Sequence, residues 1–132
     1  MPGDITDASR RQALAGRLAG HGRLDVLVSN AGICDDGPIE QQSLDELRRV
    51  IEVNLISVLD LCRLTAPLLL AAPAASVINV ASMYGIVASR GPIAAYNATK
   101  GALVSLTRQL AAQRGERGVR ATRWPPATSR PS

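Results

Sequence analysis

The sequence is short of most residues that mark metal-binding, secreted or nucleic-acid-binding proteins. Its 132 residues include no phenylalanine, one tryptophan, two tyrosines and one histidine. Cys34 and Cys62 lie far apart and form no C-x-x-C pattern, which predicts free thiols in a reducing, cytoplasmic setting. The lone His21 has no cysteine or histidine cluster around it, so we expect no metal site. No uninterrupted apolar run approaches the roughly 18 residues of a membrane span, and no signal sequence opens the chain.

The excess positive charge is confined to one end of the chain. The net charge is +4, and the residues from Arg114 onward contain five arginines and one glutamate, while the preceding part is balanced. Nucleic-acid-binding domains usually spread a basic stripe over a folded face and interleave aromatic side chains. The confined charge and the scarcity of aromatics predict no nucleic-acid partner.

Hydrophobic periodicity predicts alternating helices and strands. We expect helices over residues 8–20, 43–71 and 92–113, and strands over 24–29, 76–82 and from 118 onward. Ser43 and Glu46 form a capping box that predicts where the long middle helix begins, and Pro67 is expected to kink the end of that helix. The pattern predicts an α/β fold, a partial Rossmann-like doubly wound parallel sheet in a three-layer α/β/α arrangement.

In such sheets, chemistry gathers beyond the carboxyl ends of the strands. The two segments to search are therefore residues 29–32 and 81–85. Ser82 closes the second predicted strand, where its hydroxyl could donate to a substrate oxygen. The alternative is an ordinary polar residue leaving a strand.

Tyr96 and Lys100 stand four residues apart near the start of the last predicted helix, so they share one face. A nearby ammonium favours the phenolate and lowers a tyrosine's pKa from about 10, which suits a general acid/base. The alternative is a chance surface pair. Lys100 is, however, the only lysine beside fourteen arginines, which favours a specific need for an ammonium at this position.

Asn54 lies among apolar neighbours inside the long predicted helix. Asparagine is a poor residue for a helix interior, and a buried amide needs hydrogen-bond partners. The sequence leaves two interpretations open, a functional amide or a satisfied polar residue of the core.

Four stretches in this order resemble the short-chain dehydrogenase/reductase family. They are "LDVLVSNAGI", "VNLISV", "INVASMYG" and "YNATKGAL". The resemblance extends from about Asp4 to Ala121. Ser29 stands where the family's N-N-A-G motif has its first asparagine, a departure that weakens one structural hydrogen bond and leaves the chemistry intact.

The resemblance implies a hydride transfer between NAD or NADP and a small carbonyl or alcohol substrate. Tyr96 would be the acid/base, Ser82 would hold the substrate oxygen, and Lys100 would bind the nicotinamide ribose. The remaining roles that it implies are a water-holding Asn54, an adenine-binding Asp4, cofactor contacts at Asn30, Ala31 and Gly32, and a substrate pocket lined by Met83 and Tyr84.

A Gly-rich phosphate-binding turn of the family's type is expected to be absent. Gly16, Gly20 and Gly22 match its G-x-x-x-G-x-G pattern, but they close a predicted helix and precede a strand, whereas the genuine motif follows a strand and opens a helix. We interpret the three glycines as a chance match, with Gly20 and Gly22 forming a helix stop. On this interpretation, two βα units, on the order of 60 residues at about 30 each, are missing before the chain.

The last residues, 122–132, depart from the family's expected strand continuation. They read "TRWPPATSRPS", and a back-translation shifted by one base can yield "AVAPGYV". We therefore expect a partial dinucleotide-binding domain over residues 1–121 and a non-native or disordered tail produced by a single-base deletion.

Three interpretations of function remain. The first is an incomplete oxidoreductase with little activity of its own, whose parent is a homotetramer or homodimer formed through the helices near Ser43 and Pro92. The second is a non-catalytic remnant that associates with other subunits. The third is the sugar-nucleotide epimerase branch, which shares Y-x-x-x-K but fits "SNAG" and "YNATKGAL" less well. NAD or NADP specificity is not predicted.

Overall fold

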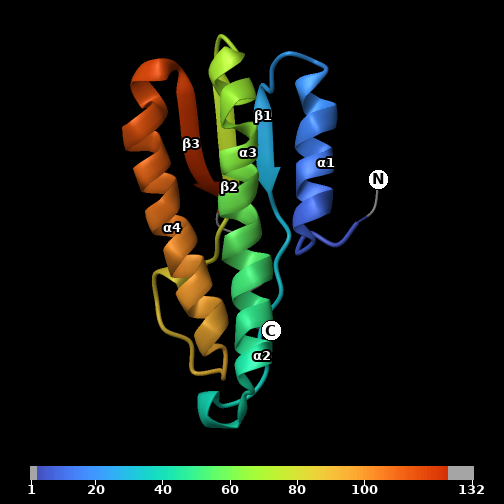
Figure 1. The fold of residues 1–132 in the computed structure, drawn as a ribbon. Coiled ribbons are helices and arrows are strands. Elements are labelled where there is room, and N and C mark those ends of the chain that lie inside the picture. The colour runs from blue at the N-terminus through green and yellow to red at the C-terminus, as the bar shows by residue number, and fades with distance from the viewer. Residues whose placement is uncertain (1–2, 125–132) are drawn as a thin grey trace, which may run out of the picture.

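The computed structural model describes residues 3–124, which form an α/β fold with every predicted helix and strand (Figure 1). The main elements in chain order are α1 (Ala8–Ala19), β1 (Val26–Ser29), α2 (Leu44–Ile51), α3 (Ser57–Ala71), β2 (Ala75–Val80), α4 (Ala94–Arg114) and β3 (Val119–Trp124). Short 3₁₀ turns lie at Ile39–Gln41, Met83–Gly85 and Gly115–Arg117. The predicted alternation of helices and strands is confirmed.

The three strands form one parallel sheet in the order β1-β2-β3. Its central register pairs Val28 with Ile78 and Ile78 with Thr122. The carboxyl ends of all three strands therefore meet at one edge, as the sequence predicts for a doubly wound fold. Among the strands of residues 3–124, β1 lies at one edge of this sheet and β3 at the other.

The hydrophobic core lies between the sheet and helices α3 and α4. Its buried side chains include Val77 of β2, Val119 of β3, Val58 and Leu69 of α3, and Leu103 of α4. Along β2 the buried positions alternate with partly exposed ones, because successive side chains of a strand point to opposite faces.

Within residues 3–124, only one of the two expected helical layers covers the sheet. Figure 1 shows α3 and α4 in front of the strands, with α1 beside them next to α3. On the other face, Val26 and Val28 are 51% and 55% exposed, and Trp124 is 64% exposed. We call these three residues, with the partly exposed Ile78 and Val80, the open face.

Several element boundaries differ from the predicted ones. β1 begins at Val26, and β2 ends at Val80, so that Ser82 lies beyond the strand and opens the 3₁₀ turn at Met83–Gly85. β3 continues through Trp124 by pairing with β2 up to Val80, three residues past the point where we expected the native pattern to end. The rest of the predicted tail, 125–132, lies outside the described residues.

Helices α2 and α3 are joined by a π-helical turn over Glu52–Ile56, which the sequence pattern did not predict. The capping box at Ser43 and Glu46 is confirmed, with both reciprocal hydrogen bonds present. Pro67 lies inside α3, which continues to Ala71. By length and composition the helix Leu44–Ala71 could cross a membrane, but it also supplies much of the core, as core helices of globular domains do.

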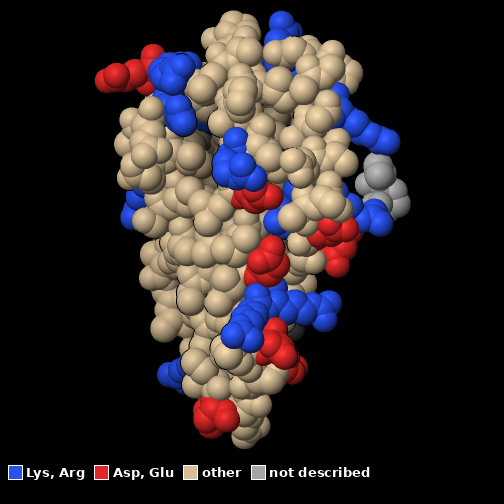
Figure 2. Space-filling view, in the orientation of Figure 1, with Lys and Arg blue, Asp and Glu red and all other residues tan. Residues whose placement is uncertain are grey.

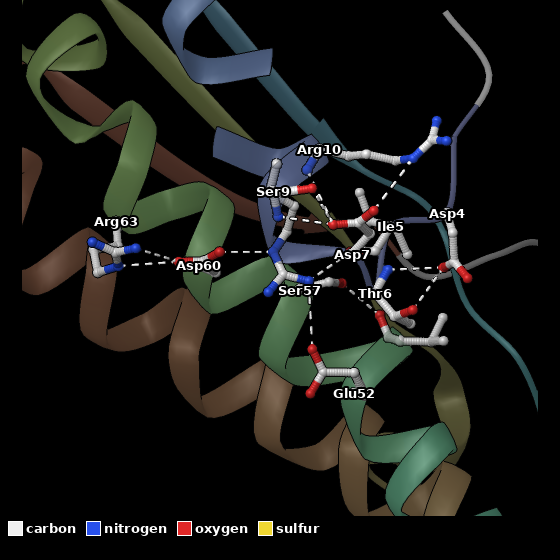
Figure 3. Close-up of polar contacts among 12 residues, drawn as sticks. Asp4, Ile5, Thr6, Asp7, Ser9, Arg10, Glu52, Ser57, Asp60 and Arg63 are labelled. Atoms are coloured by element: carbon white, nitrogen blue, oxygen red, sulfur yellow. Dashed lines mark hydrogen bonds and ion pairs between the residues drawn. The ribbon is translucent and has the colours of Figure 1, made fainter. Parts of the chain in front are cut away.

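A buried arginine of α1, Arg11, pairs with Asp60 of α3 and Glu52 of the π-helical turn, two acidic residues that Figure 3 labels. The Arg11 side chain is 5% exposed; its Nε donates to Asp60 Oδ2 at 2.7 Å, and its Nη1 donates to the Ile5 carbonyl oxygen at 2.7 Å. Glu52 lies 3.4 Å from the same guanidinium. At the other end of α1, Gly22 has a φ of +77°, which supports its interpretation as part of a helix stop.

Candidate active site

The candidate site is centred on Lys100, whose ammonium lies at the carboxyl end of β2. Its side chain is buried, with 3% of the residue exposed. Lys100 Nζ donates a hydrogen bond of 2.8 Å to the carbonyl oxygen of Val80, and it lies 5.5 Å from the centroid of the Tyr96 ring. Residues 96 and 100 therefore lie on the same side of α4, as the spacing predicts. Burial lowers the pKa of Lys100, because a charged amine loses solvation there.

Asn54 is fully buried in the π-helical turn, and its amide holds the loop that follows β1. Its Oδ1 accepts from the backbone nitrogen of Ile33 at 2.8 Å, and its Nδ2 donates to the carbonyl oxygen of Ile33 at 2.8 Å. Nδ2 also donates to Thr99 Oγ1 of α4 at 3.1 Å. The amide thus joins three segments at the site. Both its oxygen and its nitrogen have hydrogen-bond partners, as expected of a satisfied polar residue in the core.

Gly32 lies against both the lysine and the asparagine. A Cβ at this position would be 3.3 Å from Lys100 Nζ and 3.5 Å from Asn54 Oδ1. The two polar atoms therefore border a common space beside the backbone of Gly32. Asn30, Ala31 and Gly32 are exposed, so this loop is open to solvent at the carboxyl edge of the sheet.

The 3₁₀ turn carrying Ser82, Met83 and Tyr84 packs against α4. Ser82 is 5% exposed, and its hydroxyl oxygen accepts from the backbone nitrogen of Tyr84 at 3.2 Å. Met83 and Tyr84 are 40% and 37% exposed. Gly85 allows the close packing, since a Cβ there would lie 2.6 Å from the carbonyl carbon and oxygen of Lys100.

Asp4 lies in the segment before α1 and makes its side-chain hydrogen bonds locally (Figure 3). Its Oδ1 accepts from the backbone nitrogen of Thr6 at 2.9 Å and from the Thr6 hydroxyl at 2.8 Å. These bonds lower the pKa of the exposed Asp4 carboxyl. Within residues 3–124, no hydrogen bond joins Asp4 to the other predicted site residues.

Two residues at the site were not predicted from the sequence. Asp35 is 6% exposed and accepts from the backbone nitrogens of Ala95 and Tyr96 at the start of α4. Thr99 is 2% exposed and donates from its hydroxyl to the carbonyl oxygen of Tyr96 at 2.8 Å. One signal was available for Asp35: no Ser, Thr, Asp or Asn stands immediately before α4, so its first turn had to find a cap elsewhere.

Comparison with known proteins identifies a family for almost the whole chain. Residues 1–130 match the sequence profile of the family described as short chain dehydrogenase. Galactitol 2-dehydrogenase of Rhizobium johnstonii is 38% identical over 121 residues, which are 89% of this chain and 47% of that protein. D-threitol dehydrogenase of Mycolicibacterium smegmatis is 35% identical over 118 residues, covering 89% of this chain and 45% of that protein.

The fold has the same relatives. The crystal structure of a gluconate 5-dehydrogenase from Burkholderia cenocepacia, in complex with NADP and tartrate, superposes with a TM-score of 0.85 at 28% identity. The match covers 93% of this chain and 48% of that one. The chain thus spans about half the length of the relatives it matches.

Proposed function

Since this chain belongs to the short-chain dehydrogenase family, we propose that it is part of an NAD(P)-dependent oxidoreductase acting on a small carbonyl or alcohol substrate. The observation that carries the proposal is the buried Lys100 ammonium, held on Val80 beside the ring of Tyr96. Within residues 3–124 no carboxylate pairs with Lys100, and an unpaired cation is costly to bury, so a lysine at this position favours a functional role.

The residues around Lys100 fit a nicotinamide cofactor. A Cβ at Gly32 would lie 3.3 Å from the ammonium, so the glycine leaves room beside the ammonium. An ammonium has three donors, and the one given to Val80 leaves others for the ribose hydroxyls. Asn30, Ala31 and Gly32 would contact the cofactor through their exposed loop, and Asp4 would accept from the adenine. When bound, the cofactor supplies or accepts the hydride.

The chain's own residues would handle the proton. Tyr96 would exchange a proton with the substrate oxygen through its phenol, while Ser82 would hold that oxygen through its hydroxyl, and Met83 and Tyr84 would line the pocket. Asn54 Oδ1 and Lys100 Nζ border the same space beside Gly32. A water there would connect the lysine to solvent and let protons pass.

Polyhydroxylated alcohols are the first substrates to test, because the relatives are named for galactitol, threitol and gluconate. We propose a cytoplasmic protein, in keeping with the free thiols of Cys34 and Cys62. We also propose a homotetramer or homodimer of the parent protein through the helices starting near Ser43 and Pro92. Figure 2 shows few charged side chains over α4, and Leu59 of α3 and Ile56 of the preceding π-helical turn are 40% and 38% exposed.

The direct test is cofactor binding by the purified chain. NADH and NADPH fluorescence is titrated with the unsubstituted 132-residue chain, which we call the parent chain, and with Tyr96→Phe. Turnover of a panel of polyols and sugars is then measured with both chains. We expect weak binding of a nicotinamide cofactor and little turnover, any turnover being abolished in Tyr96→Phe. A folded chain that binds neither cofactor, or turnover that survives the substitution, would contradict the proposal.

A second candidate, association with another subunit without catalysis, is favoured by the open face of the sheet. Val26, Val28 and Trp124 expose apolar surface there. Co-purification with a full-length relative, in the absence of any cofactor binding, would support this candidate over the first.

A further inference from the structure

We propose that Asp35 is a positioning residue that holds Tyr96 in place by capping α4 from the loop after β1. The consequence for catalysis rests on the function proposed above. Among residues 3–124, no hydrogen bond or ion pair joins the Asp35 carboxylate to the Tyr96 phenol or the Lys100 ammonium. It acts on the backbone from which the phenol projects.

The capping contact joins segments far apart in the sequence. Asp35 Oδ1 accepts from the backbone nitrogen of Tyr96 at 2.8 Å, and Oδ2 accepts from that of Ala95 at 3.1 Å, across 61 and 60 residues of chain. Ile93, at the N-cap position of α4, makes no side-chain cap. The first N–H groups of a helix have no partner within it. A buried carboxylate therefore supplies what the local sequence lacks.

Further hydrogen bonds hold both the Asp35 carboxylate and the loop that carries it. Gln42 Nε2 donates to Asp35 Oδ2 at 3.1 Å and to the carbonyl oxygen of Gly37 at 2.8 Å. Two residues before Asp35, the backbone of Ile33 is bound at both its nitrogen and oxygen by Asn54. The loop thus has little freedom to carry the cap away from α4.

Burial alone would raise the pKa of Asp35. Hydrogen bonds from Gln42 and from the backbones of Tyr96 and Ala95 outweigh this effect and hold the pKa below its ordinary value. Asp35 is therefore an anion at neutral pH, as a carboxylate at a helix N-terminus should be.

The peptide groups on both sides of the Tyr96 Cα are fixed by side chains. The nitrogen is bound by Asp35, and the carbonyl oxygen accepts from the hydroxyl of Thr99 at 2.8 Å. Thr99 in turn accepts from Asn54. Asp35 and Asn54 therefore set the position of the Tyr96 backbone together, and the backbone sets where the ring lies relative to Lys100. Small errors in such placement are costly for catalysis.

A purely structural cap would stabilise α4 and leave the tyrosine ring unaffected in the molecules that remain folded. The two roles are separable because the chain has two tyrosines. In a Tyr84→Phe background, Tyr96 is the only one, and meta-fluorotyrosine incorporation gives a single fluorine NMR signal from its ring. The variants are Asp35→Ala and Asp35→Asn, with Asp36→Ala as the matched control, since Asp36 is the exposed neighbour.

We expect Asp35→Ala to move the fluorine resonance toward that of free fluorotyrosine and to speed amide exchange at Ala95 and Tyr96 about fivefold or more. Asp35→Asn should lie between Asp35→Ala and the parent, because its one carbonyl oxygen can still accept from Tyr96 while its amide group faces other donors. Asp36→Ala should leave both signals unchanged.

A folded Asp35→Ala chain whose fluorine resonance matches that of the chain with the native Asp35 would overturn the proposal, even if its amide exchange is faster, because that is the result of a purely structural cap. If Asp35→Ala does not fold, the comparison is made with Asp35→Asn, and a fluorine resonance equal to that of the native Asp35 chain would likewise overturn the proposal. Neither readout needs cofactor or turnover. Loss of the proposed enzymatic function would appear only in the NADH and NADPH titrations, so the two failures are distinguishable.

Discussion

The Lys100 ammonium and the Val80 carbonyl oxygen are joined by a 2.8 Å hydrogen bond. Val80 is the last residue of β2 and Lys100 lies in the second turn of α4. The bond therefore fixes the cation at the point where the central strand ends, beside the ring of Tyr96. Burial opposes the charge there and lowers the pKa of Lys100. Holding a charged ammonium at this position therefore costs the fold desolvation free energy.

Replacing this lysine should separate binding from stability. In Lys100→Met the apolar stem is kept and the opposed charge is removed, so we expect the free energy of unfolding to change by no more than about 1 kcal/mol. Loss of charge-assisted hydrogen bonds to the cofactor should weaken NADH or NADPH affinity about 10-fold or more. Urea denaturation and fluorescence titration measure the two quantities.

The matched control is Arg108→Met, which removes an exposed cation from the same helix. It should leave the cofactor affinity unchanged. Equal affinities in the parent chain and Lys100→Met would mean that the ammonium takes no part in binding the cofactor.

The sequence predicted those parts of the site that depend on local spacing. Tyr96 and Lys100 share a side of α4 because they are four residues apart. The Asp35 cap was not predictable in this way, since its partners lie 60 and 61 residues away and only the tertiary fold brings them together. The π-helical turn at Glu52–Ile56 was not predictable from the local pattern either, and its Asn54 is bound by two segments that are distant in sequence.

The layer arrangement was predicted only in part for a related reason. Apolar residues on both faces of a strand indicate that both faces can be covered, but they do not say whether the covering helices lie in the same stretch of chain. Val28 reads in the sequence like Val77, yet Val28 is 55% exposed and Val77 is 2% exposed.

Gly85 should be intolerant of even one added methyl group. A Cβ there would lie 2.6 Å from the backbone of Lys100, so the turn carrying Ser82 would have to move away from α4. We expect Gly85→Ala to lower the free energy of unfolding by about 1–3 kcal/mol and to weaken cofactor binding, as measured by urea denaturation and NADH fluorescence.

Gly16→Ala is the control for this substitution. Gly16 lies inside α1 with nothing within 4 Å of its would-be Cβ, so alanine should raise the free energy of unfolding by roughly 0.5–1 kcal/mol. Destabilisation of similar size by both substitutions would show that the close contact of Gly85 with α4 is not what limits that position.

The ion pair between α1 and α3 should give the fold an acid-sensitive component. Hydrogen bonds from Arg11 and then Arg63 lower the pKa of Asp60. A carboxylate with a lowered folded pKa stabilises the fold above its unfolded pKa of about 4, and this contribution is lost as the pH falls through the folded value. Asp60→Asn should therefore cost about 1–3 kcal/mol at neutral pH, and its difference from the parent should shrink below about pH 4.

Urea denaturation of both chains across this pH range measures the difference directly. Asp45→Asn is the control, because its pair with Arg48 is exposed on both sides and exposed pairs contribute little. A difference between the parent and Asp60→Asn that stays constant on acidification would mean that Asp60 stabilises the fold without its charge.

The open face of the sheet should govern self-association of the chain. Val28 is 55% exposed on β1, an edge strand with no charged residue in Val26–Ser29, and apolar edge strands are sites of unwanted pairing. Val28→Lys places a charge on this face without removing a buried contact. We expect it to reduce light scattering and concentration-dependent elution, with the free energy of unfolding changed by no more than about 0.5 kcal/mol.

Val77→Thr provides the contrast on the covered face. It conserves shape but buries a hydroxyl in the core, where Val77 is 2% exposed, and it should cost about 1–3 kcal/mol without reducing association. If Val28→Lys destabilised the fold as much as Val77→Thr does, the face carrying Val28 would have to be covered in solution. The chain would then bury that surface against another copy of itself even at low concentration, and the elution volume of the parent would already be that of an oligomer.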